Sequence, residues 1–394
     1  MGQQLTDYIH NLNCETGLED IISVEHRSNN SKRDFLFCNK IQGKHIPVDP
    51  RDTFSMLDRL IDRLGGKLKN EKVLVIGFAE TATAIASYIA SHMDECVYYM
   101  QTTREDCKAY KQIADFSEEH SHATEQKLFG DVKNIPNISY ILFIDDELTT
   151  GKTILNIIKS ISKVFTDVKF GVASICNWQD KEHISTFNNA GIDRFYLLSG
   201  NIIDENKKMN SQVIVGKPDI YGKENDDGLM HYVEKDVVFN EVNPFYIERT
   251  GRVPDSDKYD EIIIEAFKEC EWFINGANNV LILGTEEFMY IPLMVADLIG
   301  CKGINVKFHA TTRSPIDVTD SKDTRITSKV KLHSAYDINR DTYLYNLNKY
   351  DKVVIITDCD CTKEFMDDLT SSLVHYGNNI QDIMFLKLLG EDGG

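Results

Sequence analysis

The sequence predicts an α/β protein made of two successive Rossmann-like units, each built on a parallel β-sheet. Short β-branched runs such as 141–144 (ILFI) end in small or acidic turns and alternate with amphipathic helices. A second series of the same elements follows from residue 259 onward. We therefore expect an N-terminal arm or hood over 1–60, a first unit over 61–200, a linker with small strands over 201–258, and a second unit over 259–394.

The first unit begins with a buried-strand run at 73–76 (VLVI) and a turn of small residues at 77–83 (GFAETAT). A helix follows that turn, and the first N–H groups of a helix are unpaired, so the turn offers an anion site. The next strand, 97–100 (VYYM), runs into Arg104, whose guanidinium suits phosphate oxygens. Both features lie at the carboxyl ends of strands, where open α/β sheets bind their ligands.

The central stretch of this unit is 140–158 (YILFIDDELTTGKTILNII). Asp145 and Asp146 follow a buried strand, and the hydroxyl-rich turn 149–153 (TTGKT) leads into a helix. The turn can bind a phosphate, because the helix dipole and the free N–H groups both favour an anion. The two carboxylates suit hydroxyl groups or a cation on the same ligand. A sugar phosphate satisfies both halves of the motif.

Three interpretations of this stretch compete. The first is a buried strand with an acidic N-cap, and the second is a nucleoside-triphosphatase loop ending in GKT. The leading glycine of that loop would fall at position 146, which is Asp, and the acidic strand precedes the turn instead of following it separately. In the third, IDDELTTGKT resembles the phosphoribosyl-pyrophosphate (PRPP) loop of the type I phosphoribosyltransferases. This resemblance implies that Asp145 and Asp146 bind the ribose hydroxyls and that the 5′-phosphate lies against Thr149, Thr150, Gly151, Lys152 and Thr153.

The same resemblance assigns two further parts of the first unit. In that family a loop after the first strand binds pyrophosphate, and the matching residues here are Ala79, Glu80, Thr81 and Ala82. Arg104, at the end of the next strand, is expected to bind the pyrophosphate with them. A mobile loop closes over PRPP and excludes water, which corresponds to the polar stretch 116–123 (FSEEHSHA). This implies that Glu119, His120 and His122 belong to the closing loop, with either histidine as an acid or base near neutral pH. From the residues alone, the stretch is a surface loop or a metal site.

The second unit repeats the first. The segments 280–287 (VLILGTEE), 306–313 (VKFHATTR) and 353–358 (VVIITD) align with 73–80, 97–104 and 141–146, in the same order and at nearly the same spacing. The second copy differs at the ligand site, because its turn, 361–365 (CTKEF), has no glycine. A side chain there blocks the close approach of backbone to phosphate. The residues that remain as a candidate second site are Thr312, Arg313, Ser314 and Asp358.

Four motifs together extend the resemblance to nearly the whole chain: GFAETATA, EEHSHATE, IDDELTTGKT and TTRSP. They resemble a bacterial two-domain family in which an orotate-phosphoribosyltransferase-like domain precedes a TRSP domain. The resemblance implies a type I phosphoribosyltransferase fold followed by a diverged copy. It also implies a link to tellurium-resistance-type stress gene clusters, to a stress response and to nucleotide metabolism.

Composition excludes several classes of function. With 43 basic and 62 acidic residues the net charge is −19, which argues against a nucleic-acid backbone binder. The sequence has neither a membrane-span-length apolar run nor a signal-peptide pattern. Its nine scattered cysteines are typical of reduced thiols. We therefore expect a cytoplasmic protein with no nucleic-acid or membrane partner.

The expected function is transfer of ribose 5-phosphate from PRPP to a small nitrogenous acceptor, with release of pyrophosphate. Mg²⁺ would neutralise the pyrophosphate as a Lewis acid, with Asp145 and Asp146 as candidate further ligands. A homodimer is the expected assembly. Two alternatives stay open: a PRPP- or nucleotide-sensing protein without turnover, and a nucleoside-triphosphatase that depends on Lys152.

Overall fold

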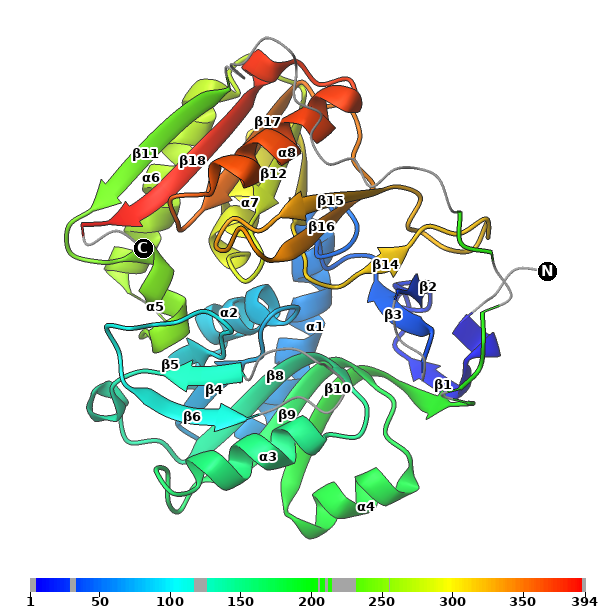
Figure 1. Ribbon diagram of the computed structural model, residues 1–394. Coiled ribbons are helices and arrows are strands. Elements are labelled where there is room, and N and C mark those ends of the chain that lie inside the picture. The colour runs from blue at the N-terminus through cyan, green and yellow to red at the C-terminus, as the bar shows by residue number, and fades with distance from the viewer. Residues whose placement is uncertain are drawn as a thin grey trace.

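Two mainly parallel β-sheets lie one above the other in the molecule, and between them three helices pack against one another (Figure 1). These helices are α1 (Pro50–Leu68), α2 (Thr83–His92) and α7 (Tyr290–Gly300). The computed structural model describes residues 5–28, 33–116, 126–204, 206–209, 212–214, 232–254 and 256–391.

The first sheet contains six strands of the described chain, in the order β1-β10-β9-β8-β4-β5. All neighbours are parallel except β1, which runs antiparallel to β10. The strands are β1 (Ile9–Cys14), β4 (Val73–Gly77), β5 (Cys96–Gln101), β8 (Tyr140–Leu148), β9 (Lys169–Asn177) and β10 (Ile192–Ile202).

The second sheet contains five described strands in the order β11-β18-β17-β12-β13, and all its neighbours are parallel. The strands are β11 (Val233–Phe239), β12 (Asn279–Gly284), β13 (Asn305–Ala310), β17 (Lys352–Thr357) and β18 (Ile383–Gly390). The α/β fold class with two parallel-sheet units is thereby confirmed.

The duplication is visible in the topology. Strands β9-β8-β4-β5 of the first sheet and β18-β17-β12-β13 of the second have the same order, and the aligned segments occupy the same places. The segment 201–258, expected to link the units, contributes β11 to the edge of the second sheet and the helix α5 (Pro244–Thr250).

Of the remaining helices, α3 (Lys152–Ile161), α4 (Lys181–Asn189) and α8 (Lys363–His375) cover the outer faces of the sheets. Helix α6 (Asp257–Phe273) instead packs beside α7 on the inner face of the second sheet. Short 3₁₀ turns lie at Leu5–Asp7, Val132–Asn134 and Ile380–Asp382. The small strands are β2 (Ile22–Arg27), β3 (Phe35–Asn39), β6 (Gln112–Phe116), β7 (Gln126–Phe129), β14 (Ile316–Asp317), β15 (Lys329–His333) and β16 (Asp341–Tyr345). No helix in the described ranges is long and apolar enough to cross a bilayer.

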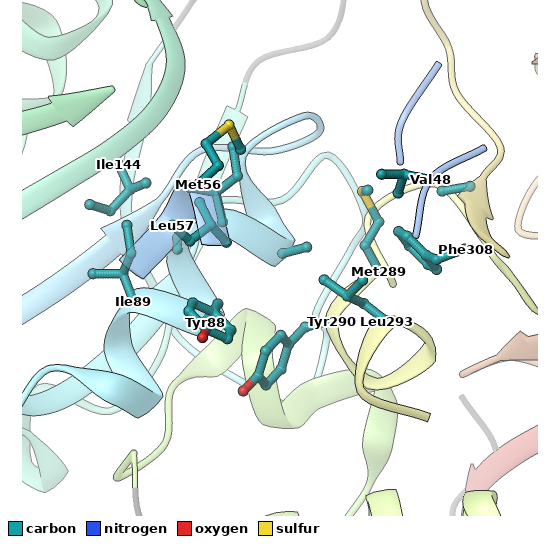
Figure 2. Close-up of a cluster of buried hydrophobic side chains, with 14 of the residues drawn as sticks. Val48, Met56, Leu57, Tyr88, Ile89, Ile144, Met289, Tyr290, Leu293 and Phe308 are labelled. Atoms are coloured by element: carbon teal, nitrogen blue, oxygen red, sulfur yellow. The ribbon is translucent and has the colours of Figure 1, made fainter. Parts of the chain in front are cut away.

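Alternation along the central strands explains why each sheet is buried on both faces. Val75 of β4 and Ile282 of β12 point into one core that both units share, whereas their neighbours Leu74 and Leu281 point into separate outer cores. Figure 2 shows part of the shared core, where side chains of α1 and α2 lie near those of α7 and β13. The two units therefore share one continuous hydrophobic core.

The N-terminal segment also joins the two units. Strands β14, β2 and β3 form one small antiparallel sheet, so a strand of the second unit pairs with the N-terminal hood (Figure 1). Val48, just before α1, pairs with Phe308 of β13 through backbone hydrogen bonds of 2.9 and 2.8 Å. The hood is thus attached to both units.

Candidate active site

The acidic pair lies inside strand β8, because pairing with β9 continues past it to Leu148. The strand was expected to end just before the pair. The backbone N–H of Asp146 donates to Asp145 Oδ1 at 2.9 Å, and Thr81 Oγ1 donates to Asp146 Oδ1 at 2.9 Å. Thr81 belongs to the loop after β4. The acidic pair and the predicted pyrophosphate loop are therefore in direct contact.

The turn after β8 depends on one glycine. Gly151 is the N-cap of α3 and has a φ of 74°, a conformation that favours glycine. A Cβ at this position would lie 2.3 Å from Phe187 Cζ, so a side chain would also clash. Buried Ile154, Ile157 and Ile161 then hold one face of the helix against the sheet. Since glycine offers no capping side chain, the start of α3 suits an anion.

The loop after β4 is fixed by hydrogen bonds from three sides. Ala79 N donates to Thr102 Oγ1 at 2.8 Å, and Gln126 Nε2 of β7 donates to Ala79 O at 2.7 Å. Gln42 Nε2 donates to Thr81 O at 2.5 Å. The loop is therefore held in one shape before any ligand arrives.

A pocket of about 260 Å³ opens at the carboxyl ends of β4, β5 and β8. It brings together an acid of β8, the start of α3, the loop after β4 and the end of β5, and two of its lining residues come from the second unit. The lining residues are Phe78, Ala79, Glu80, Thr81, Arg104, Gln126, Asp145, Thr153, Arg313 and Ser314.

Charges of both signs meet at this pocket. Lys44, which is fully buried, lies 2.5 Å from Glu80 Oε1 and donates to the carbonyl oxygens of Glu286 and Thr311 at 2.6 and 2.9 Å. Burial alone would raise the pKa of Glu80, but the charges of Lys44, Arg313 and Arg104 outweigh it and lower that pKa to about 2. These cations therefore favour the charged form of Glu80.

The two units contact each other through equivalent residues of the repeat. Arg104 N of the first unit donates to Glu287 Oε1 of the second at 2.9 Å, and Arg313 N of the second donates to Glu80 Oε1 of the first at 3.2 Å. These four residues are partners in the sequence repeat, Arg104 with Arg313 and Glu80 with Glu287. The duplicated units are thus related by an approximate twofold axis that passes between these two contacts.

The matching site of the second unit is filled by protein. Arg249 of α5 is fully buried and its guanidinium bonds both Glu287, with Nε–Oε2 at 3.2 Å, and Asp358. Tyr336 donates its hydroxyl to the other oxygen of Asp358 at 2.6 Å. The start of α8 is capped by the side chain of Thr362, at the place where α3 has glycine. The region that holds a ligand pocket in the first unit is occupied here by an ion pair and a capped helix.

The structure brings together most of the predicted site residues. Ala79, Glu80, Thr81, Arg104, Asp145 and Thr153 line the pocket, and so do Arg313 and Ser314, which were expected to form a separate second site. Asp146 contacts Thr81, whereas Ala82, at the start of α2, is buried. Thr149 and Thr150 are half-buried on the turn beside the pocket, and Lys152 is exposed. Thr312 is buried, and its N–H donates to Tyr343 O at 2.9 Å.

Three predicted residues, Glu119, His120 and His122, lie outside the described residues, which resume at Gln126 in β7. Sequence reasoning missed the roles of Lys44, Arg249 and Gln126. Lys44 stands in a turn of the hood and Arg249 in a segment without regular periodicity, so neither carried a pattern that pointed to the site.

The pocket offers an oxygen ligand of the kind Mg²⁺ prefers, the carboxylate of Asp145, whereas the carboxylate of Glu80 is paired with Lys44 at 2.5 Å. In the described part of the chain, no group of three or more His, Cys, Asp or Glu side chains forms a complete metal cage. The residues present thus fit a metal ion that a phosphate-bearing ligand also coordinates.

Comparison with known families defines the class of the first unit. Residues 21–200 match the family described as "Phosphoribosyl transferase" (PRTase_2), so this unit is a domain of the phosphoribosyl transferase class. Residues 249–373 match the family described as "TRSP domain C terminus to PRTase_2". The chain belongs to the two-domain family in which a phosphoribosyl transferase domain is followed by a TRSP domain.

Solved structures with some likeness include three phosphoribosyltransferases. The adenine enzyme of Trypanosoma brucei is 15% identical, with a TM-score of 0.33 over 48% of this chain and 81% of that one. The orotate enzyme of Aeropyrum pernix is 15% identical (TM-score 0.31, 45% and 87% covered). The adenine enzyme of Leishmania donovani is 17% identical (TM-score 0.35, 46% and 78% covered). Likenesses this weak do not define a ligand. Among proteins with curated descriptions, none matches the chain.

Proposed function

We propose that the protein transfers ribose 5-phosphate from PRPP to a nitrogen atom of a small acceptor and releases pyrophosphate. The observation that carries this proposal is the pocket itself, where Asp145, the start of α3 and the loop 79–82 converge at the carboxyl edge of one sheet. A sugar phosphate needs acceptors for its hydroxyls and N–H groups for its phosphate, and the pocket offers both within one cavity.

The reaction needs little covalent help from the protein. Departure of pyrophosphate leaves positive charge on the ribose, so positioning and fixed charges lower the barrier. Asp145 and Asp146 bind the ribose hydroxyls and face this charge, while the turn 149–153 binds the 5′-phosphate. The loop 79–82 and Arg104 bind the pyrophosphate.

A divalent cation completes the charge balance of the pocket. Two carboxylates, Glu80 and Asp145, and two guanidinium groups, Arg104 and Arg313, line it, and Glu80 is paired with Lys44 behind the pocket lining. A pyrophosphate would bring more negative charge than these two guanidinium groups neutralise. Mg²⁺ bound by the pyrophosphate and by Asp145 or Asp146 would neutralise it as a Lewis acid.

Mass spectrometry tests the proposal without a known acceptor. Cell extract is incubated with the protein, PRPP and Mg²⁺, and we expect a compound to gain one ribose phosphate while pyrophosphate accumulates in equal amount. A protein that binds PRPP yet releases no pyrophosphate with any extract would instead be a sensor. Hydrolysis of ATP that is lost in Lys152→Ala would identify a nucleoside-triphosphatase.

The stretch 116–126 provides a further prediction. We expect PRPP with Mg²⁺ to protect it from protease, because a lid that excludes water from the reacting ribose must close over bound ligand. The measurement is limited proteolysis followed by peptide mapping, with cleavage at the chain termini as an internal control. Equal cleavage of 116–126 with and without ligand would contradict a closing lid.

A further inference from the structure

The TRSP motif of the second unit, residues 312–315, follows strand β13 and reaches the pocket of the first unit. Arg313 and Ser314 line that pocket together with Thr81, Arg104 and Asp145. The motif is held in place within its own unit, since the Tyr345 hydroxyl donates to Ser314 O at 2.6 Å. One wall of the first unit's ligand site is therefore built by the second unit.

The guanidinium of Arg313 lies among four carboxylates, those of Glu80, Glu105, Glu286 and Glu287, and hydrogen bonds to two of them hold it in one orientation. Its Nε donates to Glu286 Oε2 at 2.5 Å, and its Nη2 donates to Glu105 Oε1. Within the described ranges, Nη1 makes no hydrogen bond to protein, although the side chain is only 13% exposed. Because Arg313 lines the pocket and its Nη1 makes no such bond, this nitrogen can donate to a ligand there.

The carboxylates around Arg313 also have other cationic partners. Arg340 Nη2 lies 2.9 Å from Glu105 Oε1 and 3.1 Å from Glu286 Oε2, and Lys44 is paired with Glu80. Arg313 therefore does not have to neutralise these acids alone. Together with Arg104 it gives this side of the pocket two guanidinium groups, a composition that suits the oxygens of a diphosphate.

We propose that Arg313 binds the pyrophosphate group of the ligand through Nη1, and that Glu105 and Glu286 are the residues that position it. This inference rests on the proposed function, because it names the part of PRPP that the second unit contacts. The TRSP unit then acts neither on a separate substrate nor only as a structural partner. It completes the ligand site of the first unit.

Three ligands separate this role from a general effect on the fold. PRPP, inorganic pyrophosphate and ribose 5-phosphate are titrated by calorimetry, each with Mg²⁺, into the parent protein and into Arg313→Lys. Lysine keeps the positive charge among the carboxylates but removes Nη1. We expect Kd to rise about 10- to 100-fold for PRPP and pyrophosphate, the range for a lost charged hydrogen bond, with little change for ribose 5-phosphate.

Two further variants complete the test. Glu105→Gln frees one edge of the guanidinium and should weaken pyrophosphate binding less than Arg313→Lys does, whereas exposed Arg325→Ala is the matched control and should change nothing. Unchanged pyrophosphate affinity in Arg313→Lys, or equal loss for all three ligands, overturns the inference while the proposed function stands. A parent protein that binds none of the three ligands overturns both.

Discussion

Asp146→Asn is expected to lower kcat for phosphoribosyl transfer by about 10²-fold or more, the scale for loss of one fixed charge that stabilises a transition state. The asparagine still has an oxygen that can accept the hydrogen bond from Thr81 Oγ1, now 2.9 Å from Asp146 Oδ1. The loop after β4 should therefore keep its shape, and PRPP binding should be partly retained. Two measurements on the parent and the variant check this: the rate of pyrophosphate release at saturating PRPP, and the Kd for PRPP by calorimetry.

Asp167→Asn is a suitable control for this variant. Asp167 is exposed in the same unit, and its φ of 57° is one that asparagine also adopts readily. It should turn over like the parent protein. If Asp146→Asn also turned over at the parent rate, the ribose site would not include this carboxylate.

Arg249→Ala is expected to destabilise the protein by about 3–5 kcal/mol, the usual cost of removing one partner from a buried ion pair. Glu287 and Asp358 both pair with this guanidinium, and all three side chains are almost completely buried. Alanine would leave two carboxylates in the core facing an empty space. Urea unfolding of the parent and the variant, followed by circular dichroism, measures the loss.

Two comparisons make this result interpretable. Lys258→Ala removes an exposed pair with Glu241, 2.8 Å apart, and should change the unfolding free energy by less than about 1 kcal/mol. Arg249→Lys keeps a charge but cannot span both carboxylates. Its loss of unfolding free energy should therefore lie between those of Lys258→Ala and Arg249→Ala. Parent-like stability of Arg249→Ala would mean that the second unit's site is not held closed by this residue.

Much of the fold is predictable because the central strands carry a strong local signal. The runs 73–76 and 280–283 are continuous and apolar, as strands buried on both faces must be, and the repeat follows from their order. The end of β8 was misplaced for a physical reason. Asp145 is polar, yet it stays in the strand because its backbone pairs with Ser174 of β9, which no local pattern reveals.

The candidate site was predictable only within one unit. Ala79, Arg104 and Asp145 follow strands of the same sheet, so sheet geometry alone brings them together. The position of Arg313 at the pocket depends instead on how the two units pack together, through contacts such as that of Lys44 with Glu80. Such pairs join residues far apart in the sequence, and neither partner carries a signal for the other.

Calorimetric titration of PRPP, in the presence of Mg²⁺, tests the central claim most directly, namely that the chain has one PRPP site and that it lies in the first unit. The first unit keeps Gly151 at the start of α3, whereas Thr362 caps α8 and Arg249 fills the matching site of the second. The account predicts one PRPP per chain, with binding weakened in Arg313→Lys. Two equivalent sites per chain, or no binding at all, would contradict it.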